Sequence, residues 1–257
     1  MEKLINRQFV DKLQVFVFAE RQSLGQYAAR QTAAKIREFL SQQAIVRMIF
    51  AAAPSQNEFL DCLACAPDID WERIHAFHMD EYIGLQENAP QSFGRYLACH
   101  LFERVHPGRV EYIRSGNDID AECRRYGALI QEAPVDIVCM GIGENGHIAF
   151  NDPPVADFDD PDVIKPVNLD MACRRQQVHD KCFPSLDNVP TQALTLTVPA
   201  LFSGRCLYCM VPGATKREAV CHTLRDTISE ACPATVLRKH PNSMLFVDTD
   251  SFGEDTL

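Results

Sequence analysis

The chain has 257 residues, of which 46% are hydrophobic and 23% are charged, and its formal net charge at pH 7 is −10. This length suits one large domain or two small ones, and the apolar content excludes a disordered chain. The acidic balance argues against a general binder of nucleic acid or of anionic membranes, since both need a basic face.

The sequence also predicts no targeting signal and no disulfide bonds. No apolar run approaches the roughly 18 residues that a membrane helix needs. The N-terminal stretch carries Glu2 and Asp11 and lacks the apolar block of a signal peptide. The eleven cysteines are an odd number in a chain that is not small, which indicates free thiols in a reducing compartment. We therefore expect a cytoplasmic protein with no membrane partner.

Two Cys-x-x-Cys pairs, Cys62/Cys65 and Cys206/Cys209, raise the question of a zinc site. The first pair falls in a helical pattern and the second in a strand pattern. Because residues three apart in a strand face opposite sides, the second pair is poorly placed for joint ligation. We expect no metal to be bound.

The periodicity predicts strands that alternate with helices. In chain order it predicts a helix at 22–43, a strand at 46–52, a helix from about residue 58, a strand at 74–78, a helix at 92–105, a strand at 110–113, a helix at 119–131, strands at 135–140 and 206–211, a helix from about residue 216 and a last strand at 244–247. This alternation is typical of an α/β fold with a mostly parallel sheet covered on both faces.

Four of these strands are followed by polar or glycine-rich loops, at the edge where parallel sheets bind ligands. The loops are Ala53-Pro54-Ser55-Gln56-Asn57, Met79-Asp80-Glu81-Tyr82-Ile83-Gly84, Gly141-Ile142-Gly143-Glu144-Asn145-Gly146-His147 and Pro212-Gly213-Ala214-Thr215-Lys216. Together they offer carboxylates, a histidine and a lysine at a helix start. That combination suits acid–base chemistry on a phosphorylated metabolite.

Each candidate side chain also has a purely structural interpretation. Ser55 and Glu58 have the spacing of a capping box, so Ser55 either caps the next helix or faces a phosphate. Asp80 and Glu81 are either ordinary loop charges or site carboxylates. His147 is either a turn residue or a proton carrier. Only the joint arrangement of the loops is specific for a function.

These loops resemble a known family. The segments FHMDEYIGL around Asp80 and GIGENGHIAFNDPP from Gly141 to Pro154 are similar to motifs of glucosamine-6-phosphate deaminases (isomerases). ALTLTVPAL, a Gly-x-x-Lys after a strand and CPATVLRKHPNSMLFVD follow in matching order, so the resemblance covers nearly the whole chain. The related 6-phosphogluconolactonases typically read Gly-His-Thr-Ala-Ser where this chain reads Gly-His-Ile-Ala-Phe-Asn. The resemblance implies a Rossmann-like three-layer sandwich and one sugar-phosphate isomerase/deaminase domain over residues 1–257.

The resemblance also implies a reaction. A hexosamine 6-phosphate, with glucosamine 6-phosphate as the expected substrate, is ring-opened, isomerised and deaminated to fructose 6-phosphate and ammonia, with no metal and no cofactor. Asp80 would move a proton between C2 and C1, His147 would move one between O1 and O5, and Lys216 would hold the phosphate. The implied binding set is completed by Ser55, Gln56 and Glu81.

The sequence departs from the family pattern around the histidine. Asn145 stands where the family usually has Asp, and Asp152 stands where it usually has Glu. Both belong to the expected catalytic set. Asn145 can orient an imidazole but cannot stabilise its charged form, so that support would come from Asp152 or from Glu144. The first phosphate loop, residues 53–56, also differs from the usual Gly-Gly-Thr/Ser-Pro pattern.

Two other functions stay open. One is a lactonase that hydrolyses a 6-phospho-sugar lactone with His147 as the base, and the other is a weakly active sugar-phosphate-binding regulator. An NAD enzyme is disfavoured, because no Gly-x-Gly-x-x-Gly opens a helix after the first strand. The sequence does not fix the oligomeric state, and a homo-oligomer is possible. It also does not identify a second basic residue that binds the phosphate, although Arg174 and Arg175 lie in the region where relatives have one.

Overall fold

The computed structural model describes residues 3–86, 89–116 and 118–253. Its main sheet has the strand order β1-β2-β11-β10-β7-β3-β4-β6, with β1 antiparallel to β2 and the other pairs parallel. These strands are β1 (Leu4–Val10), β2 (Leu13–Phe18), β3 (Val46–Phe50), β4 (Ile74–His78), β6 (Arg109–Glu111), β7 (Ile137–Met140), β10 (Cys206–Val211) and β11 (Ser243–Asp248).

A smaller antiparallel sheet lies beside the main one. It has the order β5-β9-β8, from β5 (Asp80–Tyr82), β9 (Gln192–Leu196) and β8 (Ile164–Asn168). The α-helices are α1 (Arg21–Leu40), α2 (Asn57–Ala64), α3 (Phe93–Leu97), α4 (Glu103–Val105), α5 (Ile119–Gln131), α6 (Met171–His179), α7 (Val198–Phe202), α8 (Arg217–Arg225) and α9 (Thr249–Phe252). A π-helical segment, Ala98–Phe102, joins α3 to α4.

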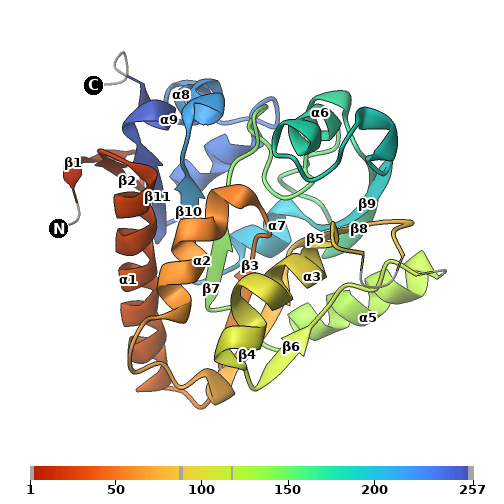
Figure 1. The fold of residues 1–257 in the computed structure, drawn as a ribbon, viewed down its shortest axis with the longest axis horizontal. Coiled ribbons are helices and arrows are strands. Elements are labelled where there is room, and N and C mark those ends of the chain that lie inside the picture. The colour runs from red at the N-terminus through yellow and green to blue at the C-terminus, as the bar shows by residue number, and fades with distance from the viewer. Residues whose placement is uncertain (1–2, 87–88, 117, 254–257) are drawn as a thin grey trace.

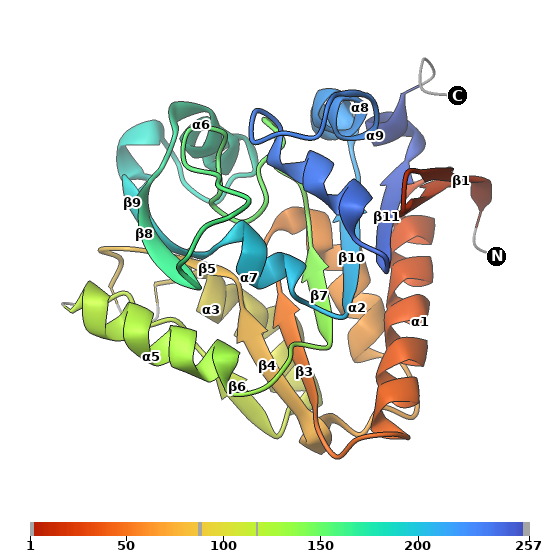
Figure 2. The ribbon, with the colours of Figure 1, turned by 180° about the vertical axis from the view of Figure 1, so that it is seen from behind.

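Alternate residues of the central strands face two separate hydrophobic cores. On β3, Met48 and Phe50 pack in the core under α1 and α2, whereas Ile49 packs in the core with α5, α7 and α8. The strands are apolar on both faces because helices cover both. Figure 1 shows α1, α2 and α3 in front of the sheet, and Figure 2 shows α5 and α7 on the opposite face. The predicted α/β class, with its mostly parallel sheet and three layers, is confirmed.

The second sheet and the β1–β2 hairpin were not expected from the sequence. β5 has only three residues, and β8 contains Lys165 and Pro166, so neither shows a clear strand period. In β1 the side chains are half exposed or exposed throughout, which removes the apolar signal of a buried strand. By contrast, the strands predicted at 74–78 and 206–211 and the helix predicted at 119–131 have those bounds in the structure.

The chain changes direction between β3 and β7, which are paired neighbours in the middle of the sheet. From β3 it moves outward through β4 to β6, and from β7 it moves the other way through β10 to β11. The segments that follow β3 and β7 therefore leave toward opposite faces and open a crevice between them. In sheets of this kind, such a switch point at the carboxyl edge is where ligands bind.

All eleven cysteines are free, as expected for a reducing compartment. Cys206 faces one core and Cys209 the other, which separates the members of that Cys-x-x-Cys pair. Among the described residues, no helix is both long and apolar enough to cross a membrane.

The central strands should carry much of the stability. Ile49 is fully buried, so Ile49→Ala removes three buried carbons and leaves a cavity. We expect the free energy of unfolding to fall by about 2–5 kcal/mol in a denaturant titration. Ile5→Ala is the matched control, because Ile5 is 51% exposed on the edge strand β1. Its effect should stay under about 1 kcal/mol, and equal losses in the two variants would contradict this account of the core.

Candidate active site

A cavity lies in the crevice at the carboxyl edge of the sheet, and it brings together side chains from four loops. Asp80, His147 and Lys216 all line it, although they come from the ends of three different strands. The remaining lining residues are Ala51, Ala52, Ala53, Ser55, Gln56, Met79, Phe93, Gly141, Ile142, Gly143, Ala149, Phe150, Gln176 and Gln177. The joint arrangement that the four loops predicted is therefore present as one cavity.

His147 is held from behind by two side chains of its own loop. Its Nδ1 lies 2.7 Å from Asn145 Oδ1 and 3.0 Å from Asp152 Oδ1. Asn145 also donates from Nδ2 to Asp152 Oδ1 at 2.8 Å, so the three side chains form a closed triangle. Burial opposes ionisation of Asp152, but the hydrogen bond from His147 and, to a smaller degree, that from Asn145 lower its pKa below the usual range.

This triangle fixes the tautomer of the histidine. Asn145 Oδ1 and the carboxylate of Asp152 can only accept hydrogen bonds, so Nδ1 of His147 must carry the proton. Nε2 then keeps its lone pair and is the nitrogen available to a ligand in the cavity. Glu144 takes no part, because its carboxylate lies 3.6 Å from His179 on α6. Asp152 is thus the carboxylate that supports the ring.

Glycine and asparagine residues shape the loop that carries His147. A Cβ at Gly143 would lie 2.0–2.3 Å from three atoms of the His147 ring, so only glycine leaves room for the ring there. Asn151 is fully buried and donates from Nδ2 to the carbonyls of Ile148 and Leu196. This ties the loop after β7 to the small sheet.

Asp80 stands in the cavity as a buried acid without a partner. The residue is 7% exposed, and the described residues give its carboxylate no hydrogen bond. Burial, and to a lesser degree the charge of Glu81, raises the pKa of Asp80 well above its usual range. A carboxylate of this kind is a stronger base than an exposed one, which suits it to remove a proton from carbon.

Glu81 was expected in the binding set, and the structure places it elsewhere. It follows Asp80 in β5, so its side chain points to the other side of the strand, away from the cavity. Its carboxylate accepts the backbone N–H groups of Tyr82, Phe93 and Gly94 at 2.9–3.1 Å. Burial raises the pKa of Glu81 to about 7 against these hydrogen bonds. Glu81 therefore anchors the start of α3.

Ser55 and Gln56 face the cavity, and the alternative capping role of Ser55 is wrong. The α2 helix has no side-chain cap, and Glu58 is instead paired with Arg21 at 2.7 Å. Gln56 donates from Nε2 to Ser55 Oγ at 3.0 Å and to the carbonyl of Met210. Because Ser55 Oγ accepts this bond, its own hydrogen is free to donate to a ligand.

Lys216 supplies the positive charge. It is only 5% exposed at the start of α8, and no described carboxylate lies within ion-pair distance of its ammonium group. Burial lowers the pKa of Lys216, while Asp180 and Glu144 partly oppose this. A buried ammonium group without a counter-ion is costly unless a ligand supplies the anion. The cavity is therefore suited to an anionic group such as a phosphate.

The sequence did not single out the two glutamines of α6. Gln176 and Gln177 line the cavity, and Gln177 accepts the hydroxyl of Tyr82 at 2.7 Å. Arg174 instead donates to the carbonyls of Leu186 and Val189, and Arg175 is exposed, so neither arginine lines the cavity. In the sequence these glutamines are two polar side chains on a helix with little apolar character. That pattern is the same as for any solvent-exposed helix, so it does not predict a place in the cavity.

Fold and site together define an α/β protein whose cavity, at the carboxyl edge of the sheet, holds a buried carboxyl group and a histidine together with a buried lysine. Comparison with known families matches residues 19–246 to the one described as glucosamine-6-phosphate isomerases/6-phosphogluconolactonase. The glucosamine-6-phosphate deaminase of Lysinibacillus sphaericus is 36% identical over 187 residues, which are 72% of this chain and 81% of the relative. That of Streptococcus sanguinis (strain SK36) is 30% identical over 78% of this chain and 83% of the relative.

Solved structures agree with this assignment. A structure described as a monomeric glucosamine-6-phosphate deaminase superposes with a TM-score of 0.85 at 29% identity, over 92% of this chain and 98% of the other. The 6-phosphogluconolactonase from Thermotoga maritima has a TM-score of 0.75 at 21% identity, over 92% and 100%, which shows a shared fold. The chain belongs to the family of glucosamine-6-phosphate isomerases and 6-phosphogluconolactonases.

Gly143→Ala should impair catalysis much more than folding. The added methyl group would displace the His147 ring, and a misplacement of about 1 Å can cost about 10²-fold in rate. We expect kcat to fall by about that factor while the thermal unfolding midpoint changes little. Gly116→Ala is the control, because a Cβ there meets no atom within 4 Å. Equal turnover in the two variants would show that the ring position does not matter.

The raised pKa of Asp80 predicts the pH dependence of the reaction. A base must be ionised, so activity should be present above the folded-state pKa of Asp80 and be lost as the pH falls through it. The acidic limb of kcat/KM should lie well above the usual carboxyl pKa of about 4. A phosphate substrate titrates near pH 6 itself, so its pKa is measured separately by phosphorus NMR. A limb at the usual carboxyl value would contradict this role for Asp80.

Proposed function

We propose that this protein isomerises and deaminates a hexosamine 6-phosphate, with glucosamine 6-phosphate as the expected substrate. The reaction consumes one water and gives fructose 6-phosphate and ammonia. The observation that carries the proposal is the unpaired ammonium group of Lys216 in the same cavity as the unpaired acid of Asp80 and the histidine triangle. The named relatives support the choice of substrate.

The two proton carriers serve different atoms of the sugar. His147 accepts a proton at Nε2 from the O1 hydroxyl and returns it to O5, which opens the ring. Asp80 then takes the proton from C2 and delivers it to C1, while a second proton passes from the nitrogen on C2 to O1, so that C1 becomes a primary alcohol and C2 becomes an imine. Water adds to the imine carbon, and the amine leaves as ammonia.

The other end of the substrate is held by charge. The phosphate binds the ammonium group of Lys216, and the free hydroxyl hydrogen of Ser55 adds a neutral donor. Gln56 supports Ser55 through its Nε2 rather than meeting the phosphate with that group. In this proposal the loops after β3 and β10 bind the phosphate, and the segments after β4 and β7 transfer the protons.

The same proposal covers the setting of the enzyme. Residues 1–257 form one domain that acts on a small-molecule sugar phosphate in the cytoplasm, with no nucleic-acid partner. The proposal is compatible with a homo-oligomer. The eleven free cysteines and the net charge of −10 support this setting.

An assay of two products tests the proposal. The purified protein is incubated with hexosamine 6-phosphates that differ at C2 or C4, and ammonia is measured by a coupled reaction. 6-Phosphogluconolactone serves as the control substrate, with acid release as its readout. Ammonia from at least one amino-sugar phosphate is expected. Acid from the lactone without any ammonia would assign a lactonase instead, and binding of sugar phosphates without either product would assign a regulator.

Lys216→Ala should act on substrate binding more than on turnover. The ammonium group meets the phosphate in the ground state and in the transition state alike, so KM should rise while kcat changes less. A hydrogen bond to a charged group is worth about 1.5–3 kcal/mol, which corresponds to a rise in KM of about 10- to 150-fold. Lys35→Ala on α1 is the control, since Lys35 pairs with Glu38 on the surface. Unchanged affinity in Lys216→Ala would place the phosphate elsewhere.

A further inference from the structure

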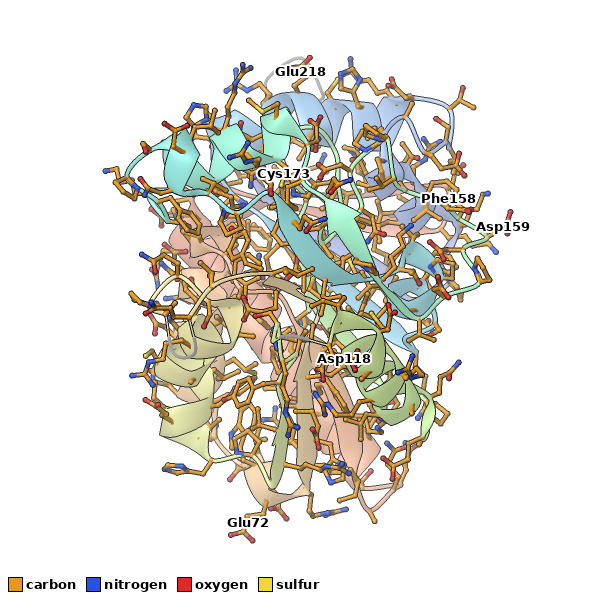
Figure 3. All side chains as sticks on the ribbon, turned by 90° about the vertical axis from the view of Figure 1, so that its right-hand side faces the viewer. Glu72, Asp118, Phe158, Asp159, Cys173 and Glu218 are labelled. Atoms are coloured by element: carbon orange, nitrogen blue, oxygen red, sulfur yellow. The ribbon has the colours of Figure 1, made fainter. Side chains whose placement is uncertain are left out.

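A cysteine of α6 lies against the histidine triangle, and the proposed reaction gives it no role. Ligand atoms of His147, Asp152 and Cys173 all lie within 4.8 Å of one another, and all three residues are buried. His147 and Asp152 belong to the loop after β7, whereas Cys173 comes from α6. In Figure 3, Cys173 lies inside the outline of the molecule at α6, while Glu218 lies at the edge.

This cluster has the composition of a zinc site. Zinc takes thiolate sulfur at about 2.3 Å, imidazole nitrogen at about 2.0–2.1 Å and carboxylate oxygen at about 2.0–2.2 Å. In a tetrahedral site, ligand atoms then lie about 3.5 Å apart. His147 and Asp152 are already 3.0 Å apart, so a shift of about an ångström in the Cys173 side chain closes the set.

Two unused atoms strengthen this interpretation. Asp152 is 1% exposed, yet its Oδ2 has no hydrogen-bond partner among the described residues. A buried carboxylate oxygen without a partner is costly, and a bound cation would remove that cost. The sulfur of Cys173 likewise has no hydrogen bond with any described residue, and it is 1% exposed.

We propose that His147, Asp152 and Cys173 form an inhibitory site for a thiophilic divalent cation of the Zn²⁺ class. When the ion binds, Cys173 releases its thiol proton to water, and the ring proton of His147 moves through water from Nδ1 to Nε2, so that Nδ1 becomes a neutral ligand nitrogen. A water molecule takes the fourth position. Hard cations such as Mg²⁺ are excluded, because they prefer oxygen ligands and a near-octahedral geometry.

Binding at this site has two consequences for the enzyme. The ion occupies the imidazole and the carboxylate that the proton transfer needs, so turnover stops while the ion is bound. It also cross-links α6 to the loop after β7, which fixes Gln176 and Gln177 over the cavity. The inference goes beyond the proposed function, because binding can be measured whether or not the protein deaminates a sugar.

Cd²⁺ binding tests the site without any substrate. Titration of the wild-type protein with Cd²⁺ should produce the ultraviolet charge-transfer band of a cadmium–thiolate bond. In Cys173→Ala, and in the conservative Cys173→Ser, affinity for one ion should fall at least about tenfold, as for loss of a group that supports a metal. Cys65→Ala is the control, because Cys65 is exposed and belongs to one Cys-x-x-Cys pair. Its titration should match the wild type.

Inhibition by Zn²⁺ is the second readout. Zn²⁺ should inhibit the wild type and Cys65→Ala equally, EDTA should restore activity, and Cys173→Ala should need at least about tenfold more Zn²⁺ for the same fractional inhibition. Loss of the cadmium band from Cys65→Ala but not from Cys173→Ala would overturn the proposal. Zinc inhibition or cadmium affinity unchanged in both Cys173 variants would overturn it too.

Discussion

The parallel pairing of β3 with β7 is the constraint on which the rest of the molecule depends. The strand order reverses at this pair, so the segments that follow the two strands leave toward opposite faces of the sheet and open the crevice that becomes the cavity. The pairing continues to the edge of the cavity, where Ala51 donates to the carbonyl of Cys139 at 2.8 Å. Because both strands are buried on both faces, neither loop can shift without disturbing a core.

The cavity keeps groups that folding alone would not favour. Lys216 and Asp80 are both buried in it without a salt bridge among the described residues. Burial lowers the pKa of Lys216 and raises that of Asp80, and both shifts favour the neutral form of the group. A protein interior normally pairs such charges. Both groups fit a site completed by the substrate, whose phosphate supplies the counter-charge of Lys216 and whose C2 proton neutralises Asp80 when it is transferred. The unfavourable burial of Lys216 therefore favours binding of the phosphate, and the unfavourable burial of Asp80 makes its carboxylate a stronger base.

The sequence predicted the elements that carry a strong period and missed those that depend on tertiary contacts. β4, β10 and α5 are apolar or amphipathic over their whole length, so their bounds were predicted. Asp80, His147 and Lys216 were predicted as site residues because each follows a buried strand. Glu81 was misplaced because the strand period of β5 appears only when β5 pairs with β9. Gln176, Gln177 and Cys173 have no local pattern, since only the packing of α6 brings them to the cavity.

The central claim is that one cavity binds a hexosamine 6-phosphate and that Asp80 moves its C2 proton. Calorimetric titration of Asp80→Asn with glucosamine 6-phosphate, followed by an ammonia assay of the same mixture, tests both parts together. The amide keeps the shape of the side chain but cannot accept the proton. We predict binding close to that of the wild type and a loss of ammonia release of at least about 10²-fold. Ammonia release at the wild-type rate would contradict the account.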